Sequence, residues 1–248
     1  MTPVVLRLEQ MNKGPHFRAA TLRDKDRTGI LDPVLGVDHA WMSAPTFPAH
    51  SHSGFSAVSY VFSDAATGLK NEDSIGTRNL IRPGGLHWTA AGRGVVHEEI
   101  PAEAGKLSHL FQIFIGLPAS RQEAAPYALS LEPENVPIFE LPGVLIRVPL
   151  GVFGTARSPM YPPTRINLLD IQVGAGAALT VPVAPGENAF VMPIKGRLTV
   201  NGIEYDADGS EIPAFSASDN AQSISLEARH GSMEAAVFSG IPVRFQEQ

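Results

Sequence analysis

Three histidines and one glutamate in the first half of the chain have the spacing of a metal site. His50 and His52 are two residues apart, and so are His97 and Glu99. Side chains at positions i and i+2 of a β-strand lie on the same face, so each pair points to one side of its strand. If the two strands lie opposite each other in a barrel, three imidazoles and a carboxylate converge. Such borderline and hard ligands suit a divalent metal ion.

Other interpretations of the same residues have less support. A single histidine is more often a satisfied core or surface residue than a ligand, but two ligand pairs with this spacing favour metal binding. His97-Glu98 also begins the helical zinc motif H-E-x-x-H. The closing position of that motif is Pro101, and a proline there argues against a continuing helix.

Four nearby residues have roles that the sequence leaves open. His87 precedes Trp88 and follows two glycines, which favours a structural or surface role. Arg93 lies in a glycine-flanked loop, which favours a surface charge over a gate for substrate. His109 and Gln112 lie on opposite faces of their strand, so only one of them can face a cavity. Gln112 is the better candidate for a residue that supports the ligands.

The composition predicts a nearly all-β fold with few helices. Gly 23 and Pro 21 together make 44 of the 248 residues, so helices of ordinary length seldom fit between them. Residues 107–117 are apolar on both faces, as expected of a buried central strand. Asn201-Gly202 between two alternating runs predicts a hairpin with a type I′ turn.

Charge and hydropathy exclude several classes of protein. The 19 basic and 25 acidic residues give a net charge of −6 without a basic cluster, which disfavours direct binding of nucleic acid. No apolar run approaches the ~20 residues of a membrane helix, and no signal peptide is visible. The absence of cysteine fits a cytoplasmic protein. We expect a cytoplasmic monomer.

Composition also divides the chain into two halves. Over residues 118–142 alanine, glutamate and proline rise and strand signals weaken, which predicts a connection there. We expect an N-terminal metal-binding barrel over residues 1–125 and a C-terminal barrel without a metal site over residues 140–248. In the second half His230 is the one histidine, and it has no His or Glu two residues away.

Two segments of the first half resemble the signature segments of the pirins, which are bicupins of the cupin superfamily. These segments are Phe47–Phe55 and Thr89–Glu99, and His109 to Gln112 matches the family's H-x-x-Q segment. The resemblance implies two antiparallel cupin-type β-barrels in tandem, with one mononuclear metal in the N-terminal barrel. The metal ligands that it implies are His50, His52, His97 and Glu99.

The chain departs from the pirin pattern beside these ligands. The usual motif is H-P-H-R-G-F-E, and here Ser51, Ser53 and Ser56 replace Pro, Arg and Glu. Many other cupins place a carboxylate ligand at the position of Ser56, which leaves Glu99 as the carboxylate. Gly85 replaces the aspartate of the usual Pro-Gly-Asp. The resemblance therefore defines the metal site better than the substrate.

The resemblance implies two functions of different classes. Some pirins resemble quercetinases, and such a metal-dependent dioxygenase would act with O₂ on a flavonol-like or other aromatic enediol substrate. Three neutral imidazoles and one carboxylate leave positions open for a bidentate ligand, and Glu99 is the candidate catalytic acceptor of the hydroxyl proton. Other pirins are regulators that bind a protein partner, with a structural or redox-sensing metal. Fe(II) is the favoured ion, although the ligand types do not separate it from Mn, Ni, Cu or Zn.

Overall fold

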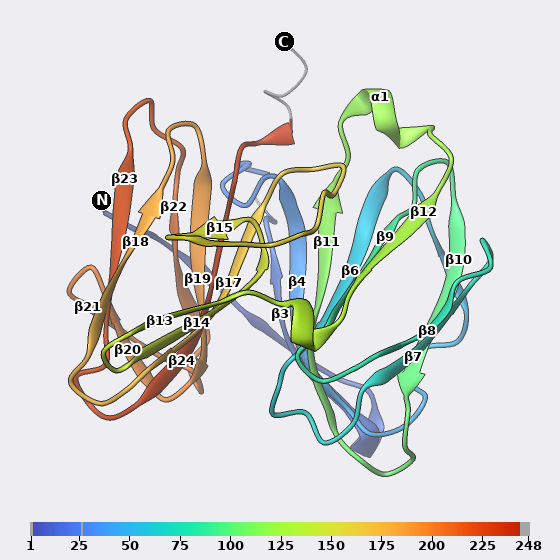
Figure 1. Ribbon diagram of the computed structural model, residues 1–248, viewed down its shortest axis with the longest axis horizontal. Helices are drawn as coiled ribbons and strands as arrows, with labels where there is room; N and C mark the ends of the chain where they lie inside the picture. The colour runs from blue at the N-terminus through green and yellow to red at the C-terminus, as the bar shows by residue number, and fades with distance from the viewer. Residues whose placement is uncertain (1, 26, 244–248) are drawn as a thin grey trace.

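The computed structural model describes residues 2–25 and 27–243, and its regular elements are almost all strands (Figure 1). The described residues contain one short α-helix, α1 (Ala119–Gln122), and two 3-10 turns, η1 (Gly14–His16) and η2 (Pro133–Asn135). The expected all-β fold is confirmed. None of the described helices is long and apolar enough to cross a membrane.

The first half of the molecule contains a seven-stranded and a four-stranded antiparallel sheet. The strands of the large sheet, in spatial order, are β12 (Tyr127–Leu131), β9 (Leu86–Ala90), β6 (Phe55–Val61), β11 (Ser108–Gly116), β4 (Val34–Met42), β3 (Phe17–Arg23) and β2 (Glu9–Asn12). Those of the small sheet are β5 (His50–His52), β10 (Val95–Pro101), β7 (Leu69–Asp73) and β8 (Arg78–Ile81).

The second half repeats this plan. Its large sheet has the order β1 (Val4–Arg7), β22 (Glu211–Phe215), β19 (Asn188–Lys195), β24 (Met233–Gly240), β17 (Asn167–Val173), β14 (Val144–Leu150) and β13 (Ile138–Leu141). Its small sheet has the order β18 (Ala178–Val183), β23 (Gln222–Glu227), β20 (Arg197–Val200) and β21 (Ile203–Asp206). The short strands β15 (Val152–Phe153) and β16 (Ala156–Arg157) form a separate pair. Among the described residues, the large and small sheets of each half are separate, rather than joined into one closed hydrogen-bonded ring.

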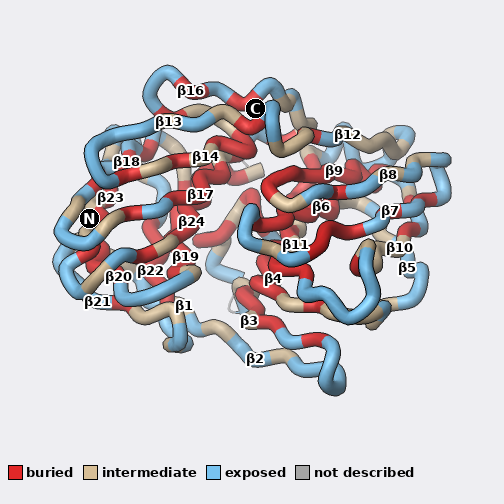
Figure 2. The backbone as a smooth tube through the Cα atoms, turned by 60° about the horizontal axis from the view of Figure 1, so that its bottom comes forward, coloured by how far each residue is buried: buried red, intermediate tan, exposed pale blue. Residues whose placement is uncertain are grey.

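The two large sheets pack against each other and form the core between the halves. Buried residues concentrate there (Figure 2). One apolar cluster includes side chains from both sheets, and the rings of Phe111 and Phe238 are 5.5 Å apart in it. Burial of this apolar surface holds the two halves together.

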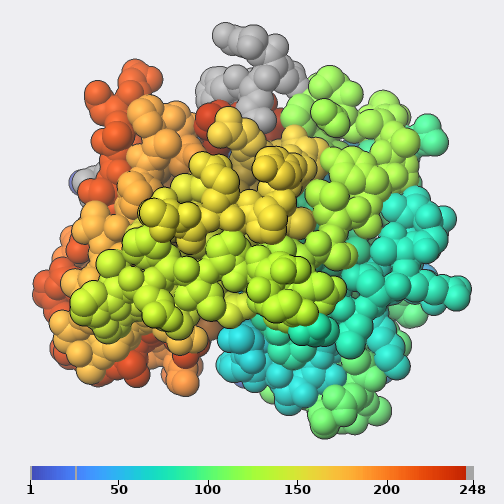
Figure 3. Space-filling model, in the orientation of Figure 1, coloured from blue at the N-terminus to red at the C-terminus, as the bar shows by residue number. Residues whose placement is uncertain are grey.

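Two segments cross from one half to the other. The first described strand, β1, pairs with β22 of the second half, with Val4 opposite Ala214, and Figure 1 shows the N-terminus beside that half. Residues 118–142, where we expected a connection, contribute β12 to the first large sheet and β13 to the second. Figure 3 shows this part of the chain lying across both halves. The domain limits themselves stay a prediction.

Candidate metal centre

The strands that contain the histidines are hydrogen-bonded neighbours in the small sheet. In the antiparallel pair of β5 and β10, His97 lies opposite His50 and Val95 lies opposite His52. Directly opposite residues share a face, as do residues two apart, so all three imidazoles come to one side. The expected convergence thus occurs between neighbouring strands of one sheet.

The three histidines form a compact group of ligand atoms. One ring nitrogen from each of His50, His52 and His97 lies within 4.8 Å of the others. Nε2 of His52 and Nε2 of His97 are 3.0 Å apart. The centroids of the three rings are 4.8 to 4.9 Å apart. Three nitrogens this close together can bind one ion, since a divalent metal binds each imidazole at about 2.0–2.1 Å.

Burial keeps two of these imidazoles neutral. Together with a smaller effect of the neighbouring histidines, it lowers the pKa of His97 to about 3 and that of His52 to about 4. Asp73, which lies directly opposite His97 on β7, counteracts part of this effect. Neutral imidazole is the form that binds metal, so the site is prepared for an ion at neutral pH.

The second ring nitrogen of His50 has a hydrogen-bond partner that can orient the ring. Nδ1 of His50 is 2.9 Å from the carbonyl oxygen of Pro48, and it donates a hydrogen bond there when it carries the proton. That tautomer leaves Nε2 free to bind an ion. Nδ1 of His97 is buried and has no hydrogen-bond partner among the described residues.

Glu99 lies in the same cavity but outside this compact group. Its Oε2 accepts a hydrogen bond from the Ser59 hydroxyl at 2.6 Å, and the same hydroxyl is 3.1 Å from Oε1 of Gln112. Burial raises the pKa of Glu99 to about 7, although the bond from Ser59 opposes part of this rise. The group of mutually close ligand atoms is formed by the three histidines. The role of Glu99 as the fourth ligand therefore stays a prediction.

The metal-site cavity lies between the small and large sheets of the first half and has a volume of about 120 Å³. Apolar side chains from β3, β4, β11 and the loop before β5 surround the polar groups. Its lining residues are Phe17, Asp38, Ala40, Met42, Phe47, His50, His52, His97, Glu99, Leu110, Gln112 and Phe114. A few polar groups at one end of a mainly apolar wall are usual for a small-molecule site.

The four residues whose roles the sequence leaves open lie in different surroundings in the structure. Gln112 lines the metal-site cavity, whereas His109 points to the other face of β11. There Nε2 of His109 lies 2.7 Å from Nε2 of His39, and its Nδ1 lies 2.7 Å from Oδ1 of Asp64. His87 is buried among the hydroxyl groups of Thr89 and Ser130, so its surroundings are structural. Arg93 is exposed.

Glycines fix the turn that leads into β10. Gly92 has a φ of +50°, and a Cβ atom there would lie 2.2 Å from the carbonyl oxygen of Ala124. The Gly92 carbonyl accepts a hydrogen bond at 2.7 Å from the amide of Gly54, which follows β5. This contact joins the two loops that flank the ligand strands.

Sequence reasoning missed the residues that form the apolar wall and the ion pair behind it. Phe17 and Phe47 lie edge to face, with ring centroids 4.9 Å apart, and come from distant parts of the chain. Asp38 lines the cavity and pairs with Arg23 at 2.8 Å. The alternation of Asp38, Ala40 and Met42 on β4 was the available signal, because residues two apart on a strand share a face.

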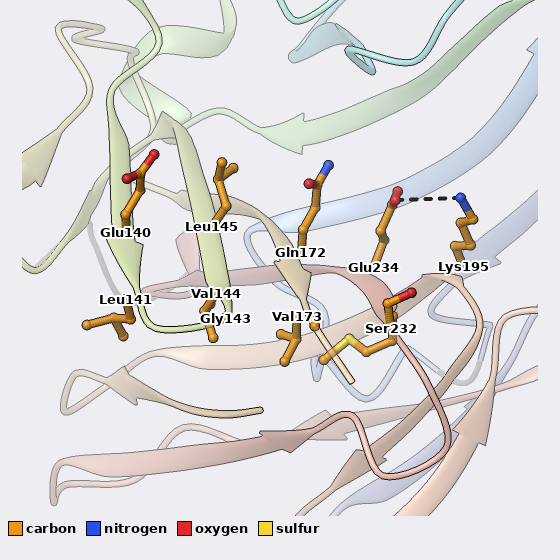
Figure 4. A pocket seen from close by; sticks show the side chains of 12 residues that line it. Glu140, Leu141, Gly143, Val144, Leu145, Gln172, Val173, Lys195, Ser232 and Glu234 are labelled. Atoms are coloured by element: carbon orange, nitrogen blue, oxygen red, sulfur yellow. Dashed lines mark ion pairs between the residues drawn. The ribbon is translucent and has the colours of Figure 1, made fainter. Parts of the chain in front are cut away.

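A second and larger hollow lies on the other half, away from the histidines (Figure 4). It has a volume of about 430 Å³, and side chains from five neighbouring strands form a row across it. The row consists of Glu140, Leu145, Gln172, Glu234 and Lys195. Lys195 and Glu234 form an ion pair at 3.9 Å.

A two-half β fold with three histidines on neighbouring strands of one small sheet defines a metal-site protein of the cupin type. A family model described as Pirin matches residues 17–115. Pirin-1 of Arabidopsis thaliana is 30% identical over 200 residues, which cover 80% of this chain and 67% of that protein. The chain belongs to the pirin family, as its sequence predicts.

Two further similarities concern proteins with a named activity. A Pseudomonas aeruginosa protein described as "Putative quercetin 2,3-dioxygenase PA3240" is 31% identical over 183 residues, which cover 69% of this chain. The chain spans 63% of the length of that relative, which is less than two thirds. The crystal structure of a quercetin 2,3-dioxygenase from Acinetobacter baumannii superposes with a TM-score of 0.84 at 24% identity, covering 97% of this chain and 86% of that one. This second similarity establishes the fold.

Proposed function

We propose that this protein is a metal-dependent dioxygenase that incorporates both atoms of O₂ into a small aromatic enediol. The observation that carries the proposal is the convergence of three histidine nitrogens within 4.8 Å of one another beside a cavity with an apolar wall. The relative described as a quercetin 2,3-dioxygenase supports the same reaction class.

The proposed ion is one divalent metal held by His50, His52 and His97, with Glu99 as the fourth ligand. Fe(II) is our favoured ion, because imidazole and carboxylate ligands with open positions suit O₂ chemistry on iron. A bound ion supplies positive charge that lowers the pKa of a substrate hydroxyl, and it supplies a path for electrons between the enediol and O₂.

The side chains around the ion position have distinct roles in this proposal. Glu99 accepts the first hydroxyl proton of the substrate, and Ser59 holds the Glu99 carboxyl in place through the 2.6 Å hydrogen bond. The rings of Phe17, Phe47 and Phe114 contact the apolar part of the substrate and exclude water from the cavity. The bond between the two oxygen-bearing carbons breaks, and the substrate supplies the four electrons that O₂ takes up.

Oxygen uptake tests this function directly. Protein loaded separately with Fe(II), Cu(II) and Mn(II) is mixed with catechol or with quercetin in air, and O₂ and substrate absorbance are recorded together. We expect equal loss of O₂ and substrate with at least one metal, and background rates for metal-free protein. No uptake with any metal and any enediol would favour the alternative, a regulator that binds a protein partner and uses its metal for structure or redox sensing.

A further inference from the structure

We propose that the metal-site cavity selects single-ring aromatic 1,2-diols of the catechol class and excludes three-ring flavonols, with Phe17 and Phe47 setting this limit. The inference rests on the proposed function, because it assumes that an enediol binds beside the three histidines. It goes beyond that function by naming the substrate class and the side chains that determine it.

The volume of the cavity carries the size argument. It is about 120 Å³. Sites for ligands of drug size, such as a three-ring flavonol, have volumes of roughly 300–1,000 Å³. The cavity is therefore too small for three rings without rearrangement, and it favours a diol with a single six-membered ring.

The floor and walls of the cavity are packed side chains that cannot move apart at low cost. Phe17, Ala40, Met42 and Leu110 are all buried and belong to one apolar cluster with Val61, Leu69 and Ile81. Core packing is close to crystalline density, so widening such a wall by a whole ring strains its neighbours. An additional ring of a bound substrate would have to project out of the cavity through its opening to solvent, the mouth.

We place Phe47 at that mouth, because it is partly exposed whereas the apolar wall residues named above are buried. It is half-buried in the loop between β4 and β5, and its ring is held from two directions. The ring of Phe17 meets it edge to face at 4.9 Å, and the Lys13 ammonium group lies 3.9 Å from its centroid. Contacts of both kinds add to the packing energy of the ring, so they hold Phe47 in this position.

The chemistry of the lining fits a catechol. The diol end would lie at the three histidines and Glu99, and the unsubstituted edge of the ring would contact Met42, Leu110 and Phe114. Ring opening then forms one new carbon–oxygen bond at each hydroxyl-bearing carbon and breaks the bond between these two carbons. O₂ is reduced by the four electrons that the diol loses, and the two hydroxyl protons return on the two carboxyl groups, so no further reductant is needed.

Binding to zinc-loaded protein tests the size limit without turnover, because Zn²⁺ has no redox chemistry. The dissociation constants of catechol and quercetin are measured by calorimetry under argon for the wild type, Phe47→Ala and Phe17→Ala. We expect catechol to bind the wild type at least about tenfold more tightly than quercetin. Phe47→Ala should improve quercetin binding by about tenfold and change catechol binding by less than about threefold.

Phe139→Ala is the matched control, because its ring packs against Phe153 in the second half, at 5.3 Å between centroids, away from the metal-site cavity. It should leave both constants unchanged. If Phe47→Ala loses its folded circular dichroism signal, Phe47→Leu replaces it.

The outcomes separate the two proposals. If quercetin binds the wild type as tightly as catechol, or if neither folded Phe variant admits quercetin, the size limit is wrong and the proposed function stands. If neither diol binds to protein that carries stoichiometric zinc, the proposed function itself is overturned, and the size limit with it.

Discussion

The hydroxyl group of Tyr60 on β6 donates a hydrogen bond to Oδ2 of Asp170 on β17, with 2.6 Å between the two oxygens. Both side chains are buried, and the two residues belong to opposite halves of the molecule. A polar contact therefore lies within the mainly apolar interface of the two large sheets. Removal of the hydrogen-bond partner of a buried carboxyl group destabilises the folded protein more than removal of the partner of an exposed one.

Removal of this hydroxyl group should destabilise the folded protein. Tyr60→Phe leaves a buried carboxylate oxygen without its donor, so we expect the free energy of unfolding to fall by about 1–3 kcal/mol. Urea unfolding followed by tryptophan fluorescence measures the change. Tyr205→Phe is the control, because the Tyr205 hydroxyl is buried without a hydrogen-bond partner among the described residues. Equal losses in the two variants would contradict the assigned role of the Tyr60 hydroxyl.

Asp170 should also make stability depend on pH. Burial raises its pKa from 3.8 to about 6, although the bond from Tyr60 and the charge of Arg147 oppose the rise. Between these two values the unfolded chain has lost the proton while the folded protein keeps it. The contribution of Asp170 to stability is therefore complete below about pH 4 and is lost as the pH rises through about 6.

Asp170→Asn isolates this effect, since an amide does not titrate. Relative to the wild type, the variant should gain up to about 3 kcal/mol between pH 4 and pH 7, at about 1.36 kcal/mol for each unit of pKa difference. Chemical denaturation of both proteins at several pH values gives the difference. A difference that stays constant over this range would show that Asp170 titrates alike in the folded and unfolded states.

Metal content should depend on the histidines of the compact group. The double variant His50→Ala, His97→Ala removes two of its three nitrogens, so the bound metal should drop to background after loading with Fe(II) or Zn²⁺ and desalting. Mass spectrometry of the metal per mole of protein provides the measurement. His230→Ala, which removes an exposed histidine bonded to Glu204 in the second half, should keep full stoichiometry. Unchanged metal in the double variant would refute the ligand assignment.

Two glycines beside the ligand strands should differ in their tolerance of alanine. Gly92 and Gly54 both have positive φ, at +50° and +77°, but a Cβ at Gly54 meets no atom within 4 Å. The backbone conformation costs about 1–2 kcal/mol in either variant. Gly92→Ala should lose more stability than Gly54→Ala, because its Cβ atom also clashes with the Ala124 carbonyl. Thermal unfolding should therefore show a lower midpoint for Gly92→Ala than for Gly54→Ala. Equal midpoints would mean that the loop moves freely away from Ala124.

Local sequence patterns predicted the features that depend on neighbours along the chain. Because His50 and His52 are two residues apart, the sequence predicted that they share one face of a strand. The structure brings them together with His97. The predicted hairpin at Asn201-Gly202 is confirmed, since β20 and β21 flank it and both residues have positive φ, at 48° and 85°. The physical reason is that strand periodicity and turn conformation are local properties of the backbone.

Contacts between distant segments could not be predicted in this way. Tyr60 and Asp170 are 110 residues apart, and no periodicity relates them. The width of the metal-site cavity depends on the approach of Phe47 to Phe17, which the packing of the whole first half determines. The same limit explains why the sequence could not show that the strands of the histidines are neighbours in one sheet.

The pairing of β1 with β22 has a consequence for the order in which the protein can form during synthesis. Arg7 leaves the ribosome 204 residues before its partner Glu211, so the early strand remains without its sheet while most of the chain is made. The first half can fold around its histidines during this interval, because domains generally form from the N-terminus onward. β1 can pair only after β22 has emerged, and it then covers the edge of β22 that would otherwise be open to other chains.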